Sequence, residues 1–358
     1  MIVSSQQDNS EAREEVAGSI PTKQAGAKKQ PSKAVADLQA MIDPKQDTAS
    51  LRPNSLEGYI GQDKIVKQLE LIIKSAKIRE TVPEHMLFHG QPGLGKTTLA
   101  SLISNELNAS LKTVAAPALQ KTGDVVSLLM NLEPHTVLFI DEIHRLKAPL
   151  EEVLYSGMED GVVDIMMGKG QGVNLGRFDL NPFVLVGATT QLGKVSKPLK
   201  DRFPTVFHLQ PYTEADMLAL VERNIAILGL QLDLPARRLV CERCRGVPRI
   251  ANNILKRFLD LQIVHDIEEI DLLTAREFMT ELGIFKQGLT QADFNYLQAL
   301  ADGSLGLKTI SGVLMEDPET LEVVTEPYLI YLGLIDKSSD GRRLTPKGQK
   351  LLKATRSR

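Results

Sequence analysis

The feature that most constrains the fold is the stretch GQPGLGKT at residues 90–97, which matches the phosphate-binding pattern GxxxxGK[ST]. It follows a short apolar run, MLFHG at 86–90, and precedes a helical segment, LASLISNELN at 99–108. In a strand, glycine-rich loop and helix of this order, backbone N–H groups curl around phosphate oxygens at the helix N-terminus. The sequence therefore predicts an α/β domain that binds a phosphorylated ligand.

Two more apolar runs, TVLFID at 136–141 and FVLVGATT at 183–190, have the composition of strands that are buried on both faces. Such strands indicate a parallel sheet covered by helices. We expect this domain to span residues 51–210. Helical periodicity without strand runs predicts a smaller helical domain at 211–282. Helices followed by a strand-turn-strand signal predict a third domain at 283–358.

Residues 1–50 are rich in Ser, Gln, Ala, Lys and Glu and contain no aromatic residue, which predicts a disordered tail. The chain as a whole is 42% hydrophobic and 24% charged, as expected for a soluble globular protein, and no apolar run is long enough to cross a bilayer. Two cysteines exclude a disulfide framework and favour the reducing cytoplasm. The net charge of −3 means that any nucleic-acid contact must come from a local patch.

The phosphate-binding pattern assigns roles to its residues. Lys96 is expected to reach the β- and γ-phosphates, and the hydroxyl of Thr97 to bind Mg²⁺. Gly93, Gly95 and Thr98 complete the predicted nucleotide-binding set.

Two carboxylates, Asp141 and Glu142, end the apolar run at 136–141. Ligands bind at the carboxyl ends of parallel strands, so Asp141 suits the Mg²⁺ shell and Glu142 suits a general base that polarises an attacking water. An alternative is that the two acids only cap a helix. The motifs predict nucleotide hydrolysis, and the absence of the guanine-binding pattern NKxD favours ATP.

Further segments identify the class of protein. In order, LRPNSLEGYIGQ, GQPGLGKTT, LFIDEIHRL, GATT, PLKDRF and GVPRIAN resemble the AAA+ family and, within it, the RuvB family of bacterial Holliday-junction branch-migration motors. The likeness runs from about Leu51 to about Arg343. It implies an AAA+ P-loop core, a helical lid and a C-terminal winged-helix domain. Clamp-loader ATPases share the AAA+ skeleton but lack these phrases.

The function implied by the resemblance is ATP-driven translocation of double-stranded DNA, which drives branch migration of Holliday junctions in recombination and repair. The implied cofactors are ATP and Mg²⁺. The implied partners are a homo-hexameric ring, a RuvA-like junction-binding protein and a RuvC-like resolvase. Two alternatives stay open, namely another AAA+ ATPase such as a clamp-loader subunit and a non-hydrolysing, nucleotide-gated DNA scaffold.

The resemblance also implies roles for arginines. Arg202, in KDRF, matches the arginine that reaches the γ-phosphate bound by a neighbouring subunit, and a guanidinium there would stabilise the charge of phosphoryl transfer. Arg249, in GVPRIAN, matches the sensor-2 arginine that contacts the γ-phosphate of its own subunit. Alternatively, Arg202 is a surface ion-pair residue and Arg249 only solvates a helix start.

Weaker transfers concern the nucleotide surroundings. Thr189 and Thr190 share the sensor-1 position, and the sequence leaves open which one faces the phosphate. Further implied nucleotide contacts within the subunit are Leu51, Arg52, Ile60 and Tyr212, and those made to a neighbouring subunit's nucleotide are Glu159, Asp160 and Gly161.

The stretch VDIMMGKGQGVNLGRFDL at 163–180 predicts a β-hairpin, and in the family a hairpin at this position docks on RuvA. Apolar residues suit a small, reversible interface, so Val173, Leu175 and Phe178 are the predicted anchors. The alternative is a tip that folds back onto its own chain.

Basic residues gather on and beside the turn SSDG in the third domain, namely Lys337, Arg342, Arg343 and Lys347. A basic wing would lie along a DNA backbone and give affinity without sequence choice. The alternative is an ordinary solvated C-terminal end. The lone pair Cys241 and Cys244 lacks the further ligands of a zinc site, and we interpret it as packing of the small domain.

Overall fold

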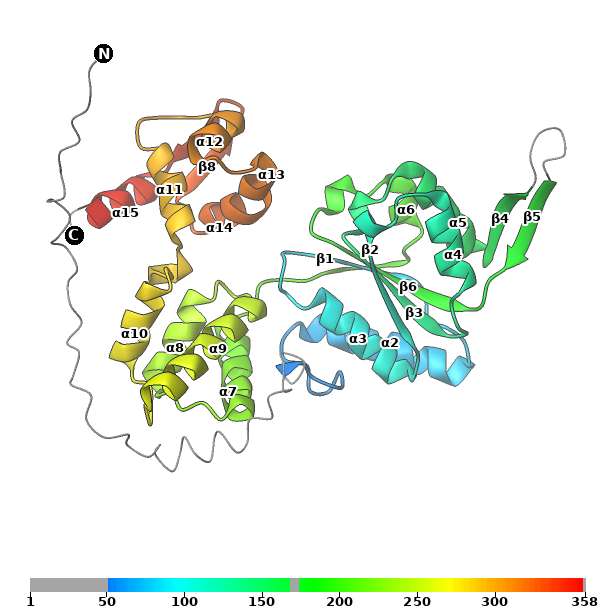
Figure 1. Ribbon diagram of the computed structural model, residues 1–358, viewed down its shortest axis with the longest axis horizontal. Coiled ribbons are helices and arrows are strands. Elements are labelled where there is room, and N and C mark those ends of the chain that lie inside the picture. Colours follow the sequence, from blue (N-terminus) through cyan, green and yellow to red (C-terminus); the bar gives the residue numbers. More distant parts are fainter. Residues whose placement is uncertain (1–50, 168–173, 357–358) are drawn as a thin grey trace, which may run out of the picture.

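A computed structural model describes residues 51–167 and 174–356 of the chain (Figure 1). The predicted tail and the predicted hairpin tip lie outside the described residues, so both stay predictions. Within the described ranges, no helix combines the length and the apolar character needed to cross a membrane.

The first part of the chain is a five-stranded sheet whose strands are ordered β2-β3-β6-β1-β7 and pair in parallel. Its strands are β1 (Met86–His89), β2 (Leu111–Ala115), β3 (Thr136–Asp141), β6 (Phe183–Thr189) and β7 (Thr205–His208). Its helices are α2 (Asp63–Arg79), α3 (Lys96–Leu107), α4 (Thr122–Met130), α5 (Ala148–Glu159) and α6 (Lys197–Asp201), with short helices η2 (Ala116–Ala118), η3 (Ile143–Arg145) and η5 (Leu192–Lys194).

Successive strand residues bury on opposite faces of this sheet. Phe88 packs in the cluster with α2 and α3, whereas its neighbour Leu87 packs in the cluster with α4, α5 and α6. Figure 1 shows α2 and α3 below the sheet and α4 to α6 above it. The predicted strands at 86–90, 136–141 and 183–190 and the predicted parallel sheet are confirmed.

The second part is helical and consists of α7 (Glu214–Leu228), α8 (Leu234–Arg243), α9 (Pro248–His265) and α10 (Leu272–Glu281). Helices α7, α8 and α10 each have an N-cap residue whose side chain accepts a hydrogen bond from a backbone N–H of the first turn. These N-cap residues are Thr213, Asp233 and Asp271. Such caps satisfy donors that the first turn leaves free. The helices enclose an apolar core of their own around Phe258.

The third part follows η6 (Lys286–Gly288). It contains α11 (Gln291–Ala299), α12 (Leu307–Leu314), α13 (Pro318–Thr320), η7 (Leu321–Thr325), α14 (Glu326–Tyr331), β8 (Ile335–Ser338), β9 (Gly341–Leu344) and α15 (Pro346–Arg356). Strands β8 and β9 form an antiparallel hairpin, and Leu305 forms an isolated antiparallel bridge with Arg342. This is the predicted winged-helix arrangement of helices followed by a wing.

A buried ionic group lies in the centre of the third part. Glu326 is 1% exposed and accepts hydrogen bonds from Arg342 Nε at 2.8 Å and from the Tyr296 hydroxyl at 2.8 Å. Arg342 Nη2 lies 3.3 Å from the second carboxylate oxygen. Arg342 is itself only 9% exposed, and its guanidinium neutralises this buried carboxylate. The sequence prediction that Arg342 lies along a DNA backbone therefore disagrees with its position.

Changing Arg342 to Ala should lower the free energy of unfolding of the third domain. Glu326 would lose its closest cation and stay buried, and breaking a buried pair in this way costs about 3–5 kcal/mol. Denaturant unfolding measures the change. Arg343→Ala is the matched control, because its side chain is 66% exposed and should alter the free energy of unfolding by about 0.5 kcal/mol or less. Equal effects of the two changes would contradict this account.

Candidate functional site

The glycine-rich loop connects β1 to α3 at the carboxyl edge of the sheet. Lys96 begins α3, is 7% exposed, and its Nζ donates to the carbonyl oxygens of Gly90 at 2.7 Å and Gln91 at 3.1 Å. Burial lowers the pKa of Lys96, and the carboxylates of Glu142 and Asp141 oppose that shift. The ammonium is therefore held at the mouth of the loop by backbone oxygens on one side and acids on the other.

Two glycines of the loop are required by close approach. Gly93 has φ +84°, and a Cβ there would lie 2.8 Å from Val247 and 2.9 Å from Arg249, at the start of α9. Gly95 has φ +106°, and a Cβ there would collide with the Tyr59 hydroxyl. Only glycine tolerates both the left-handed backbone and this packing. The loop therefore contacts the helical domain directly.

The two acids lie where β3 ends. Asp141 accepts a hydrogen bond from the backbone N–H of Glu142 at 3.0 Å, and Glu142 has φ +50°, an uncommon conformation for a glutamate. Glu142 precedes η3 but makes no side-chain cap bond to it. The alternative interpretation, that the acids merely cap a helix, is therefore wrong for Glu142.

The structure distinguishes the two sensor threonines. Thr190 Oγ1 donates to Glu142 Oε2 at 3.1 Å, so it contacts the predicted base directly. Thr189 is fully buried, and its hydroxyl accepts from Gln191 N at 2.9 Å and lies 2.9 Å from His144 Nδ1. Thr190 is thus the threonine that contacts Glu142, whereas Thr189 hydrogen-bonds to the backbone of the turn that follows it.

His144, in the DEIHR segment, has no catalytic role in the sequence prediction, yet it contacts Glu142. Its Nδ1 lies 3.2 Å from Glu142 Oε2, and its side chain is 5% exposed. Burial lowers the pKa of His144 despite the neighbouring Glu142 carboxylate, so the ring is neutral at neutral pH. Its position two residues after Glu142 was the only available signal. His144 therefore contacts the predicted base as a neutral ring.

A hollow of about 410 Å³ lies between the sheet domain and the helical domain. The predicted residues that line it are Arg52, Gly93, Gly95, Lys96, Thr97, Thr98, Asp141, Glu142 and Arg249. An adjoining smaller hollow is lined by the predicted Leu51, Ile60 and Tyr212. Residues far apart in sequence therefore surround one nucleotide-sized space.

Several lining residues were not predicted. Asn252 and Asn253 lie one turn beyond Arg249 on α9, so helical spacing would have indicated them. Tyr59 precedes the predicted Ile60. Arg223, on α7, donates to the carbonyl oxygens of Gly58 at 3.2 Å and of Leu51, and so joins the helical domain to the segment before α2. No local pattern signals that long-range contact.

Arg202 is absent from the nucleotide hollow and lines another one, of about 770 Å³, formed by the C-terminal ends of α5 and α6 and by residues that precede β1 and β6. The same hollow is lined by Glu159, Asp160 and Gly161, the residues implied to contact a neighbour's nucleotide. Arg202 Nη2 donates to Glu159 Oε2 at 3.0 Å. The structure thus brings the predicted intersubunit residues together on one face, apart from Lys96 of the same chain.

The third domain contacts both other parts. Glu319, in α13, accepts from Lys194 Nζ at 2.9 Å and Gln191 Nε2 at 3.0 Å, next to Thr190. The hydrogen bonds from Lys194 and Gln191 lower the pKa of Glu319 to about 2, so the carboxylate is charged at neutral pH. Arg245 of the helical domain pairs with the buried Asp293 and lies 4.4 Å from the centre of the Tyr328 ring.

The other predicted DNA residues remain near the surface. Arg343 is 66% exposed, and Lys347, also exposed, donates to Leu332 O at 2.7 Å. Lys337 is 41% exposed, and its Nζ lies 2.6 Å from Glu322 and 3.5 Å from Glu326, which partly neutralise it. Arg343 and Lys347 are therefore the better candidates for phosphate contacts.

Strands β4 (Val162–Met167) and β5 (Asn174–Asp179) form the predicted antiparallel hairpin, which extends away from the sheet domain (Figure 1). Of the predicted anchors, Val173 lies outside the described residues, the backbone of Leu175 pairs with Met166, and Phe178 pairs with Val163 and is half-buried. Phe178 therefore lies at the base of the hairpin rather than at its tip.

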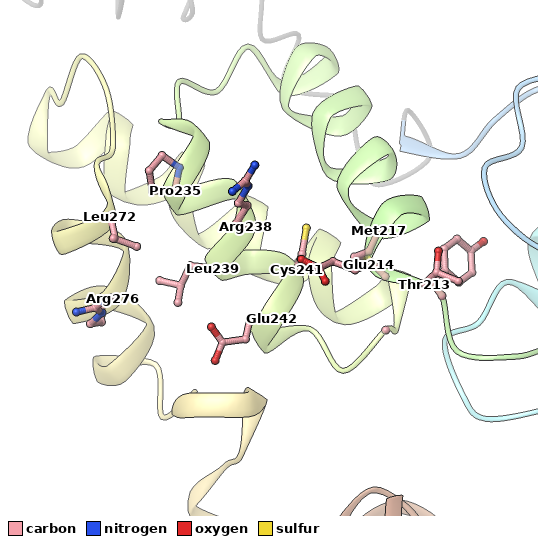
Figure 2. A pocket seen from close by; sticks show the side chains of 12 residues that line it. Thr213, Glu214, Met217, Pro235, Arg238, Leu239, Cys241, Glu242, Leu272 and Arg276 are labelled. Carbon is pink, nitrogen blue, oxygen red and sulfur yellow. The ribbon is translucent and has the colours of Figure 1, made fainter. Parts of the chain in front are cut away.

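Figure 2 shows a further hollow, of about 490 Å³, within the helical domain. Cys241 lines it beside Glu242 and Arg238, while Cys244 is buried in the domain core. Burial raises the pKa of Cys241 to about 12 and that of Cys244 to about 11, so both stay protonated thiols at neutral pH. None of the glycine-rich loop lines this hollow, although Tyr212 lines both it and the smaller hollow beside the nucleotide site.

Comparisons with known proteins agree with this geometry. Residues 51–209 match the family model of the Holliday junction DNA helicase RuvB P-loop domain, residues 212–284 the RuvB AAA lid domain, and residues 286–353 the RuvB C-terminal winged helix domain.

Individual relatives agree as well. The chain is 44% identical over 302 residues to a Holliday junction branch migration complex subunit RuvB of Lactobacillus johnsonii, covering 83% of this chain and 89% of that protein. It is 42% identical to one from Fusobacterium nucleatum, covering 83% and 91%. A solved Thermotoga maritima RuvB Holliday junction branch migration motor superposes with a TM-score of 0.77 at 37% identity, covering 85% of this chain and 98% of that one.

The two threonines should separate on substitution. Thr190→Val removes a hydrogen bond to the Glu142 carboxylate and should lower nucleotide turnover roughly tenfold, equivalent to about 1.4 kcal/mol, with little change in melting temperature. Thr189→Val leaves Gln191 N without its partner and should cost about 1–3 kcal/mol of folding stability. Steady-state hydrolysis and thermal unfolding of both variants check this. The reverse pattern would assign the sensor to Thr189.

Proposed function

This chain belongs to the RuvB family, and on that premise we propose that it is the ATP-driven motor subunit of a Holliday junction branch migration complex. The observation that carries the proposal is the convergence of Lys96, Asp141, Glu142 and Arg249 around a single interdomain hollow, with Thr190 hydrogen-bonded to Glu142. These groups come from the sheet domain and the helical domain alike. Hydrolysis there would change the contact between the two domains, and a motor needs such a change.

The chemistry follows from the types of group present. Lys96 and the backbone N–H groups of the loop would bind the β- and γ-phosphates of ATP. Thr97 and Asp141 would hold Mg²⁺, which would neutralise developing charge on the phosphoryl oxygens. Glu142, oriented by Thr190 and His144, would accept a proton from the attacking water. Arg249 would contact the γ-phosphate from the helical side.

Arg202 would complete the site of a neighbouring copy. It lies with Glu159 on a face that its own Lys96 does not share, which supports action between subunits. Hydrolysis would then require a ring, and we propose a homo-hexamer. The charge built on the transferred phosphoryl explains why an arginine is needed.

The winged-helix domain would hold duplex DNA through exposed cations on the wing and α15. Its position would respond to the nucleotide site, because Glu319 accepts a hydrogen bond from Gln191, the residue after Thr190. Arg245 joins the same domain to the lid. Lid rotation would therefore carry the DNA-binding surface with it.

The hairpin formed by β4 and β5 would dock on a RuvA-like junction-binding partner in the cytoplasm, with Val173 and Leu175 as anchors, and a RuvC-like resolvase would act on the same junction. The test is a synthetic four-way junction incubated with the chain, ATP, Mg²⁺ and a RuvA-like protein. The proposal expects ATP-dependent separation into two duplexes. Turnover without strand movement would favour a clamp-loader role, and binding without turnover would favour a scaffold.

Glu142→Gln should retain ATP binding and lose turnover by about 10²–10⁴, since the general base is removed. ATP affinity and hydrolysis in the presence of duplex DNA are the measurements. Glu133→Gln, an exposed glutamate ahead of β3, is the matched control and should hydrolyse ATP normally. Wild-type turnover in Glu142→Gln would remove this residue from the mechanism.

Arg343→Ala combined with Lys347→Ala should weaken duplex binding about equally on all sequences. Loss of two phosphate contacts should make the slope of log K against log salt shallower by up to about 2 units. Titrations at several salt concentrations measure this. Lys64→Ala with Lys67→Ala removes the same charge from the exposed face of α2 and controls for net charge. An unchanged slope in the wing variant would place DNA elsewhere.

A further inference from the structure

The surroundings of Arg202 include an aromatic residue that the nucleotide chemistry does not use. The Arg202 guanidinium lies 4.1 Å from the centre of the Tyr155 ring. Its Nη2 donates to Glu159 Oε2 at 3.0 Å, and its Nη1 donates to Pro198 O at 2.9 Å. Nε is buried and has no hydrogen-bond partner among the described residues. The arginine is thus held on three sides, and its side chain is 22% exposed.

The Tyr155 side chain is held in place by contacts of its hydroxyl group. Its hydroxyl donates to Glu151 Oε2 at 2.8 Å and lies 3.3 Å from Ser196 Oγ. Glu151 is 5% exposed, and Ser196 Oγ donates to the same carboxylate oxygen at 2.5 Å. Ser196 also accepts from Leu199 N as the N-cap of α6, the helix that ends at Arg202. The ring therefore has a set position relative to the helix that carries the arginine.

We propose that Tyr155 is the positioning residue for Arg202, holding the guanidinium extended toward the neighbouring subunit's nucleotide. A long arginine side chain that is free in solution loses rotamer freedom when it binds phosphate. Contact with a fixed aromatic ring restricts the arginine rotamers before the subunits assemble. Less conformational entropy is then lost when the guanidinium binds phosphate. The inference rests on the proposed intersubunit role of Arg202.

Glu159 completes the arrangement as an exchangeable partner. Its side chain is 55% exposed, and exposed ion pairs are weak, so a γ-phosphate can displace it from Arg202. The ring does not compete with the phosphate for hydrogen bonds, because it lies against the guanidinium carbon, and the bond from Nη2 to the exposed Glu159 is the one that a phosphate can replace. Tyr155 therefore affects the rate of hydrolysis at a site to which its own chain does not supply Lys96.

The test compares Tyr155→Leu, which removes the ring, with Tyr155→Phe, which keeps it. Tyr155→Leu should lower kcat for ATP roughly tenfold and leave KM within about twofold, because bound ATP is contacted by a different face of the subunit. Tyr155→Phe should keep most of the activity. Tyr331→Leu, a 77% exposed tyrosine on α14, is the matched control. Wild-type kcat in Tyr155→Leu would overturn the proposal.

Mixed rings distinguish positioning from a general packing defect. Tyr155→Leu subunits mixed with Lys96→Ala subunits should regain turnover, because each Lys96→Ala chain supplies an intact Tyr155 and Arg202 to its neighbour's active site. A defect in the variant's own nucleotide site would not be rescued in this way. Adding Tyr155→Leu to Arg202→Ala should cause no further loss, since one acts through the other.

A reference mixture separates this inference from the proposed function. Arg202→Ala with Lys96→Ala should also regain turnover. If that mixture stays inactive in verified rings, the intersubunit role of Arg202 fails. If it recovers and the Tyr155→Leu mixture does not, Tyr155 is a packing residue of its own subunit and the inference alone is wrong.

Discussion

Parallel pairing of β1, β3 and β6 brings their carboxyl ends to one edge of the sheet, and the phosphate-binding loop and the two acids of the nucleotide site depend on that edge. His89 pairs with Thr189 in register, so the residues that follow each strand emerge side by side. Asp141 ends the strand on the other side of β6. An antiparallel sheet would send alternate strand ends to opposite edges and would separate the loop from the acids.

The second constraint is the contact between the loop and the helical domain. Gly93 touches Val247 and Arg249 so closely that no side chain fits between them. The phosphate-binding loop is therefore a contact surface between two domains as well as a ligand site. A change in the state of the γ-phosphate would reach the lid without any intermediate element, and Arg245 would pass that movement on to the winged-helix domain.

Ionic groups in this chain divide by burial into two kinds. Glu326 and Arg342 are buried and hydrogen-bonded, and they specify how the winged-helix domain packs. Glu319, Lys194, Glu159 and Arg202 form pairs with at least one largely exposed member. Pairs of the second kind cost little to break, which suits contacts that must exchange during a reaction cycle.

Local sequence determined the loop, the strand before it and the acids at the end of β3, because each depends on neighbours within a few residues. It also predicted the central strands, whose apolar runs reflect burial on both faces. The edge strands β2 and β7 were not predicted, since most of their residues are exposed and their short runs mix polar with apolar residues. Resemblance supplied Arg202 and Arg249, whose roles no local pattern reveals.

Tertiary structure alone decided what depends on distant partners. The sequence predicted Arg342 to be an exposed cation of the wing, but in the fold it donates to the buried Glu326. The sequence does not distinguish the adjacent threonines, but in the fold Thr190 hydrogen-bonds to Glu142 and Thr189 is buried. Tyr155 and Arg202, far apart in sequence, meet because α5 and α6 pack together through Glu151 and Ser196. Short stretches of sequence determine secondary-structure propensity and local motifs. The exposure, ionisation and hydrogen-bond partners of a side chain depend on residues that are distant in sequence and that only the complete fold places next to it.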